Sequence, residues 1–210
     1  LASKSSRYAE EGTQAHELLE TCLRLDLPPE EFSEDEEKVK AVGCAFDWLR
    51  AYLVKHPKSQ YFSERRLSWG KSLGFPELTG TADLAILSED ELVLVDYKHG
   101  IGVLVDPDTS KQLRLYLLGL IEEFGPRKSY RLVIIQPRAF HQQGPIREYV
   151  ITESEIYAFK EEAKIAVQKN YDGTGTRVPG KHCSFCLAAG SCRSLAAYTL
   201  RLAIEEFATG

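Results

Sequence analysis

Two short, almost wholly apolar segments constrain the fold of this chain most. They are residues 91–97 (ELVLVDY) and 130–136 (YRLVIIQ), and both are rich in the β-branched and aromatic residues typical of strands. Strands read as continuous apolar runs when both faces of their sheet are covered. We therefore expect both segments to be buried strands of a central sheet.

The remaining periodicity predicts helices before, between and after these strands. Apolar residues recur at helical spacing in residues 7–25, 34–55, 109–124, 153–170 and 194–207. Further strands are expected at residues 60–69 and 79–87, with an edge strand at 146–151. This mixed order predicts an α/β fold, or an α+β fold, in which helices flank one central mixed sheet.

The bulk properties limit the class of protein. A chain of 210 residues is long enough for one domain with a sizeable core and a small appendage. The net charge of −5 argues against a protein that coats nucleic acid by bulk charge, although a locally acidic metal site remains compatible with it. No apolar run approaches the roughly 20 residues that span a bilayer, so no membrane association is expected. The chain begins at Leu1 and not at Met, which leaves open whether it is truncated at its N-terminus. No signal peptide is visible, and a cytoplasmic location is expected.

The chemistry is concentrated in residues 80–100 (GTADLAILSEDELVLVDYKHG). Asp96 and Lys98 are two residues apart at the end of an expected strand, so their side chains should share one face. Asp83, on the preceding strand, should meet them there. Two carboxylates aimed at one point need a cation between them, and oxygen ligands suit Mg²⁺ or Mn²⁺. A D-x-K triplet is common by chance, but here it directly follows a run that should be buried.

This arrangement of G-x-x-D, a hairpin and D-x-K resembles the PD-(D/E)XK nuclease superfamily. Two further elements resemble its RecB-like branch: Gly12 and His16 (G-x-x-x-H) on the first helix, and Gln112 and Tyr116 (Q-x-x-x-Y) after the catalytic strands. Residues four apart share a helix face, so Gln112 and Tyr116 can point together into the site. A single His or Tyr on an amphipathic helix is more often a core or surface residue, but the four elements occur here in the order of the family.

The resemblance implies a restriction-endonuclease-like core and a Mg²⁺- or Mn²⁺-dependent deoxyribonuclease. In that branch, the equivalents of His16, Asp83 and Asp96 are metal ligands, while those of Lys98, Gln112 and Tyr116 act around the DNA and the attacking water. An exonuclease of recombination or repair is implied, in a bacterial or phage-infected cell, with DNA and a recombination protein or helicase as partners. Some relatives place another acid where Glu64 lies. Basic residues near these elements are candidates for phosphate contact: Arg65, Arg66, Lys98, His99, Lys111 and Arg114.

Three of the five cysteines, Cys183, Cys186 and Cys192, are crowded near the C-terminus, which is unlike a secreted disulfide framework. Closely spaced thiolates suit zinc or an iron–sulfur cluster, and His182 would complete a zinc site. Relatives of the CRISPR adaptation nuclease and the AddAB nuclease carry a 4Fe-4S cluster held by three such cysteines and a distant N-terminal one. That cysteine is absent before Gly12, so either it lies upstream of this chain or Cys22 replaces it.

We therefore expect a nuclease core over residues 1–178 and a C-terminal cysteine module over residues 179–210, packed on the core. Two other classes compete with this interpretation. One is a catalytically silent DNA- or protein-binding module on a nuclease fold, although such a module need not keep Asp83, Asp96 and Lys98 together. The other is a zinc-stabilised structural protein with a chance D-x-K.

Overall fold

A computed structural model of the chain describes residues 7–208, and the side chains of all of these except Arg7, Tyr8 and Phe185. The chain divides after residue 164 into a larger compact unit, which holds the sheet, and a smaller unit, which holds the cysteine-rich segment. Each unit is described by itself.

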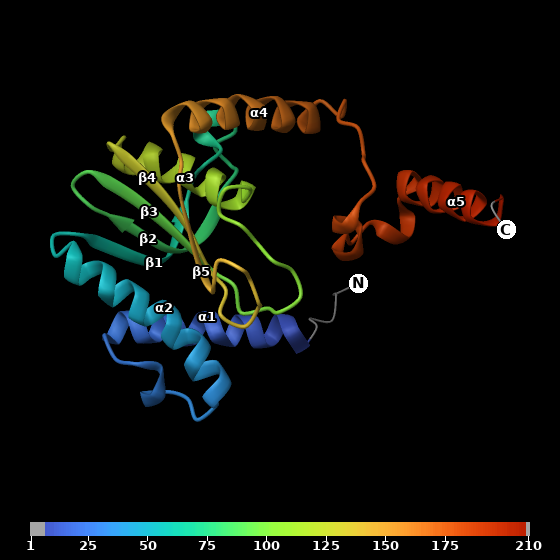
Figure 1. Cartoon of the computed structure of the whole chain (residues 1–210). Helices are drawn as coiled ribbons and strands as arrows, with labels where there is room; N and C mark the ends of the chain where they lie inside the picture. The colour runs from blue at the N-terminus through green and yellow to red at the C-terminus, as the bar shows by residue number, and fades with distance from the viewer. Residues whose placement is uncertain (1–6, 209–210) are drawn as a thin grey trace. The chain divides into compact units, whose positions relative to one another are not determined.

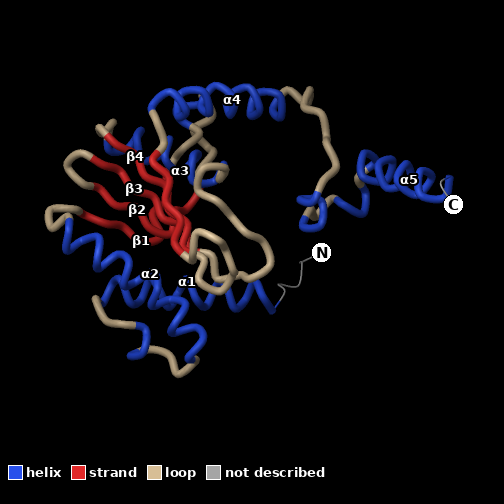
Figure 2. Tube along the Cα trace, viewed as in Figure 1, coloured by secondary structure: helices blue, strands red, loops and turns tan. Residues whose placement is uncertain are grey.

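The larger unit is built on a five-stranded sheet with the strand order β1-β2-β3-β4-β5 (Figure 2). The strands are β1 (Gln60–Leu67), β2 (Gly80–Leu87), β3 (Glu91–Tyr97), β4 (Ser129–Ile135) and β5 (Ile146–Val150). Neighbouring strands are antiparallel except β3 and β4, which are parallel. A parallel pair needs a long crossover, and α3 (Lys111–Phe124) provides it. The predicted edge strand is β5, at one edge of the sheet.

Helices cover both faces of this sheet. The helices α1 (Arg7–Leu25) and α2 (Glu36–Lys55) lie on one face, and α3 lies on the other (Figure 1). Side chains of β3 alternate between the two layers: Val93 and Val95 pack in the core formed with α1 and α2, whereas Leu92 and Leu94 pack with α3. All four are fully or almost fully buried. The predicted fold class, an α/β fold with a central mixed sheet flanked by helices, is confirmed.

Local capping interactions set where two of these helices begin. The Asp35 carboxylate accepts a hydrogen bond of 3.0 Å from the Lys38 N–H at the start of α2. The Ser110 hydroxyl accepts one of 3.3 Å from the Leu113 N–H at the start of α3. The second cap matters for function because it fixes the rotation of the helix that carries Gln112 and Tyr116.

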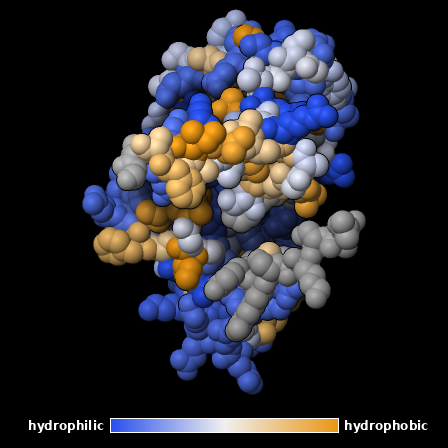
Figure 3. Space-filling model, turned by 90° about the vertical axis from the view of Figure 1, so that its right-hand side faces the viewer, coloured by the Kyte–Doolittle hydropathy of each residue, from blue (hydrophilic) through white to orange (hydrophobic). Residues whose placement is uncertain are grey.

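The smaller unit begins within α4 (Glu153–Tyr171) and continues through two 3-10 turns, Lys181–Phe185 and Ala189–Ser191, into α5 (Arg193–Ala208). The division between the units falls within α4, whereas the boundary predicted from the sequence lies after residue 178. That the cysteine module packs on the core stays a prediction. Hydrophobic side chains are exposed at several points of the surface, including the face shown in Figure 3. Among the described residues, no helix is both long and apolar enough to cross a membrane.

Candidate metal centre and active site

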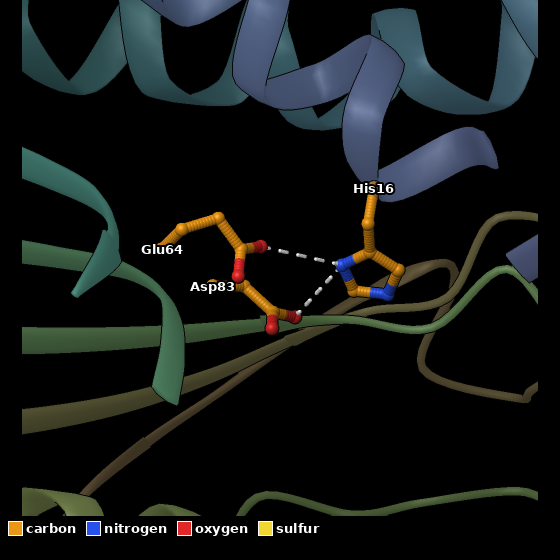
Figure 4. A group of neighbouring side chains, drawn as sticks. All are labelled: His16, Glu64 and Asp83. Carbon is orange, nitrogen blue, oxygen red and sulfur yellow. Dashed lines mark ion pairs between the residues drawn. The ribbon is translucent and has the colours of Figure 1, made fainter. Parts of the chain in front are cut away.

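Three potential metal ligands from three different elements meet at one point. They are His16 of α1, Glu64 of β1 and Asp83 of β2, and their ligand atoms all lie within 4.8 Å of one another. His16 Nδ1 lies 3.6 Å from Asp83 Oδ2 and 3.9 Å from Glu64 Oε1 (Figure 4). This is the only group of three such residues at that spacing in the part of the chain that the structure describes.

An interruption in strand pairing lies at this point. The strands β1 and β2 pair Ser63 with Leu84 and Arg65 with Ala82, but Glu64 between them has no register partner. Glu64 has a φ of 47°, in the left-handed region that residues other than glycine seldom adopt. Such backbone strain persists only where the surrounding structure enforces it, and it clusters at functional sites. Here it accompanies the approach of the Glu64 carboxylate to His16.

Asp96 lies at the end of β3 and is almost fully buried, with 3% of its surface exposed. Lys98 Nζ lies 2.9 Å from each of its carboxylate oxygens, and the contact with Oδ1 is a hydrogen bond. Asp96 Oδ2 is buried and has no hydrogen-bond partner among the described residues. Oδ2 is compensated by the charge of Lys98 alone, so this buried anionic oxygen can take a cation or a polar substrate atom as a further partner.

Asp83 and Asp96 approach each other across the β2–β3 pair. Their neighbours Leu84 and Val95 are register partners, and Asp83 Oδ2 accepts a hydrogen bond of 2.8 Å from the Tyr97 N–H. Burial raises the pKa of Asp83, and the nearby charge of Asp96 raises it further, against the opposing effects of the Tyr97 N–H and of Lys98. Burial also raises the pKa of Asp96, and Lys98 partly offsets this. A divalent cation would remove the cost of holding both carboxylates ionised.

The pKa of His16 is shifted in the direction that favours metal binding. Burial lowers it, and so do the positive charges of Lys98 and His99. A lowered pKa keeps the imidazole neutral, which is the form that binds a metal. Burial also raises the pKa of the Glu64 carboxyl, with a further contribution from Glu20.

The helix α3 brings two more of the predicted residues to the same place. Gln112 Oε1 accepts a hydrogen bond of 3.4 Å from Lys98 Nζ, and Gln112 Nε2 donates one of 3.4 Å to the Tyr116 hydroxyl. The chain Asp96–Lys98–Gln112–Tyr116 therefore runs from the end of β3 onto α3. Lys98 contacts both Asp96 at the end of β3 and Gln112 on α3, so its position depends on residues from two elements.

The structure thus gathers all six predicted site residues of the larger unit: His16, Asp83, Asp96, Lys98, Gln112 and Tyr116. One difference concerns the metal ligands, because the group that reaches metal-binding spacing contains Glu64, and Asp96 is not a member of it. The sequence analysis noted Glu64 without including it in the ligand set. Its place on the strand before Asp83 was the signal that pointed to it.

The basic residues named as candidates for phosphate contact differ in their burial and in their partners. His99 is buried, and its Nδ1 lies 2.8 Å from the Tyr97 hydroxyl. Arg65 forms an ion pair with Glu123, and Lys111 lies 3.4 Å from Glu162. Of the basic residues named from the sequence, Lys98 is the one that contacts the predicted catalytic residues.

In the smaller unit, the three C-terminal cysteines and His182 line one cavity of about 570 Å³. Cys183 Sγ accepts a hydrogen bond of 3.4 Å from the Gly180 N–H. Among the described residues, these thiols do not form a group at metal-binding spacing. Cys22 is fully buried in the core of the larger unit, and burial raises the pKa of its thiol to about 11.

Comparison with known proteins gives a family for the whole chain. The chain belongs to the family described as "Protein of unknown function (DUF2800)", which matches residues 1–210. It is similar to a protein from Eubacterium rectale whose crystal structure is named "Putative exonuclease": the identity is 14%, the match covers 92% of this chain and 77% of that chain, and the TM-score is 0.47. A second similar structure, named SSO0001, has 17% identity, covers 86% of this chain and 85% of its own, and has a TM-score of 0.35.

Proposed function

We propose that this protein is a metal-dependent nuclease that hydrolyses phosphodiester bonds of DNA. The observation that carries the proposal is the convergence of His16, Glu64 and Asp83 on one point, beside a buried Asp96 that is paired with Lys98. Lys98 offsets the charge of Asp96, but two neighbouring buried carboxylates carry two negative charges, so holding both ionised costs stability unless a further cation balances them.

The donor set fits a hard divalent cation. One imidazole and two or three carboxylates suit Mn²⁺ or Mg²⁺, whereas no thiolate belongs to the group. His16, Glu64 and Asp83 would hold the ion, and the buried Asp96, which is paired with Lys98, would add a carboxylate oxygen beside them. When bound, such an ion polarises a phosphoryl oxygen and activates water at neutral pH.

The protein's own residues then have separable roles. Lys98 is held by Asp96 and Gln112, so its ammonium is positioned to donate to a phosphate oxygen as negative charge develops there. Gln112 and Tyr116 form one polar face of α3 beside Lys98, where they can hold a DNA strand or a water molecule. The resemblance to RecB-like nucleases adds the further proposal of exonuclease action in recombination or repair, in a bacterial or phage-infected cell.

Digestion of end-labelled linear DNA and of closed circular DNA with Mn²⁺ or Mg²⁺ tests this proposal. We expect metal-dependent loss of the linear substrate, inhibition by EDTA, and loss of activity in Asp96→Asn. Asp90→Asn is the matched control, because Asp90 lies at the other end of β3 and is exposed, where it pairs with Lys128. DNA binding without any cleavage in either metal would instead favour the silent binding module, and cleavage of circular DNA would make the enzyme an endonuclease.

We also propose that Cys183, Cys186 and Cys192 hold a structural metal centre, a 4Fe-4S cluster in preference to zinc. Their shared cavity supports a single centre, and the preference for a cluster comes from the resemblance to RecB-like nucleases, because His182 in the same cavity would complete a zinc site. Because the thiols do not converge in the structure, the segment around them would have to close on the metal as it binds. The centre lies in the smaller unit, and the candidate active site needs none of its residues.

A further inference from the structure

Two loops beside the candidate active site expose apolar side chains. In the β3–α3 loop (residues 98–110) these are Ile101, Val103 and Leu104, and in the β4–β5 loop (residues 136–145) it is Phe140. Val103 is 68% exposed and Phe140 is 89% exposed. We call these four residues the apolar loop patch.

Two polar contacts join the β3–α3 loop to the β4–β5 loop. Arg138 Nη1 donates to the His99 carbonyl over 3.4 Å, and His141 Nε2 lies 3.2 Å from Asp106 Oδ1. Phe140 lies between Arg138 and His141 in sequence, and the residues of the patch in the other loop lie between His99 and Asp106. The two loops that carry the four apolar side chains therefore run side by side (Figure 1).

The backbone beneath the patch is fixed by two buried polar side chains. Gln136 Nε2 donates to the carbonyls of Gly100 and Val103, over 3.1 and 2.8 Å. The buried Arg147 donates to the Val105 carbonyl and to Gln136 Oε1. Both residues are 2% exposed or less. Hydrogen-bonded buried side chains therefore hold the backbone that carries the exposed apolar residues, and a fixed, exposed apolar patch is typical of an interaction site.

The patch is close to the catalytic residues along the chain. The β3–α3 loop begins at Lys98, and Ile101 is three residues further on, a span of about 10 Å at most. A DNA strand whose phosphate lies at Lys98 would therefore carry its adjacent bases over these side chains. The bases of a single strand expose flat apolar faces that stack on aromatic and apolar side chains, whereas a duplex hides all but its terminal pair.

We propose that the apolar loop patch contacts unpaired bases, so that the site takes a single-stranded segment of DNA. This inference rests on the proposed nuclease function, whose substrate it specifies. Phe140 is the stacking residue, and Ile101, Val103 and Leu104 form the apolar floor on which a neighbouring base lies.

The test measures binding of a short labelled single strand, and of the same strand in a blunt duplex, with Ca²⁺ in place of Mg²⁺ or Mn²⁺. Phe140→Ala and Val103→Ser should each weaken single-strand binding about tenfold and leave duplex binding nearly unchanged. Val54→Ser is the matched control, since Val54 is an equally exposed apolar residue on α2. A 2-aminopurine base placed near the end of the strand should lose its fluorescence quenching in Phe140→Ala.

A base-free substrate separates this inference from the proposed function. A strand of abasic deoxyribose phosphates has the phosphodiester bonds but no ring that could stack, so the wild type and Phe140→Ala should cleave it with Mn²⁺ at the same rate. If Phe140→Ala and Val103→Ser bind single strands as tightly as the wild type, the patch does not contact bases, whatever the activity. If these variants lose single-strand binding but the wild type hydrolyses no phosphodiester at all, the base contact stands and the nuclease function fails.

Discussion

The ring of Tyr116 on α3 lies so close to Gly80 at the start of β2 that a β-carbon at residue 80 would overlap it; the Tyr116 hydroxyl would lie 3.0 Å from that carbon. A steric reason therefore explains why the first residue of the G-x-x-D element is a glycine. It leaves room for the aromatic ring of the Q-x-x-x-Y element, so two motifs far apart in the sequence are one packing unit.

Gly80→Ala should displace Tyr116 and lower the rate of DNA cleavage by about ten- to a hundredfold, because small displacements at a catalytic site are costly. Metal affinity should change little, since the three atoms nearest to a β-carbon at residue 80 all belong to Tyr116 and none to the metal group. Gly100→Ala is the control, because a β-carbon there would meet no atom within 4 Å. If Gly80→Ala acts through Tyr116, the double variant should cleave DNA no more slowly than Tyr116→Ala alone. If the two losses of rate are fully additive, Gly80→Ala acts elsewhere.

Asp83→Asn should stabilise the metal-free protein while removing metal binding. The amide carries no charge to bury beside Asp96, and its oxygen can still accept the Tyr97 N–H. We expect the melting temperature in EDTA to rise by a few degrees, and the further rise that Mn²⁺ gives the wild type to disappear. A variant that is less stable in EDTA and is still stabilised by Mn²⁺ would contradict the assigned role of Asp83.

The same variant should alter how stability depends on pH in EDTA. Because the pKa of Asp83 is raised on folding, the folded protein binds protons more tightly than the unfolded chain does. The stability that this group contributes is present at low pH and is lost as the pH rises from about 4, the unfolded value, through the raised one. Unfolding titrations at several pH values should show this loss in the wild type and a smaller one in Asp83→Asn.

Removing either of two metal-group side chains should weaken metal binding in different ways. His16→Ala should lower affinity for Mn²⁺ more than for Mg²⁺, because imidazole suits Mn²⁺ better. Glu64→Gln should lower affinity for both ions, since it removes a charged oxygen ligand. Calorimetry measures both affinities, and Glu17→Gln is the control, because Glu17 follows His16 on α1 but is exposed and outside the group. If Glu64→Gln leaves both affinities unchanged, Glu64 is not a metal ligand, and the ligands are the ones expected from the sequence, His16, Asp83 and Asp96.

Visible absorbance and metal content should show whether the three C-terminal cysteines hold a metal centre. Protein purified without oxygen should absorb visible light and contain iron, and Cys183→Ser, Cys186→Ser and Cys192→Ser should each lose both and unfold at lower temperature. Cys44→Ser should keep the iron, because Cys44 packs against the core of the larger unit. A colourless protein with one zinc per chain would favour ligation by His182, and protein with no metal would leave the cysteines as ordinary thiols.

The sequence predicted the regular elements well because their signals are local. The first helix was expected at residues 7–25 and has those bounds, and the apolar runs became β3 and β4. The spacing of Asp96 and Lys98 correctly predicted that their side chains would meet, because alternation in a strand is fixed by its geometry. The short 3-10 turns, such as Lys71–Leu73, were not predicted, since three residues carry no periodic pattern.

The composition of the metal group was harder to predict for a physical reason. Glu64 joins His16 and Asp83 at an interruption of the pairing between β1 and β2, where its own backbone is strained. That conformation depends on the contacts of the finished fold and leaves no mark in the residues around it. Asp96, by contrast, was expected in the group and lies beside it, hydrogen-bonded to Lys98.

The metal group joins two layers of the molecule, because His16 comes from α1 while Glu64 and Asp83 come from the sheet. Next to His16 in the helix is Ala15, which has no exposed surface and is locked into the core between these layers. The distance from His16 to the carboxylates of Glu64 and Asp83 therefore depends on how closely α1 packs on the sheet. An ion held by all three side chains would therefore also link α1 to the sheet.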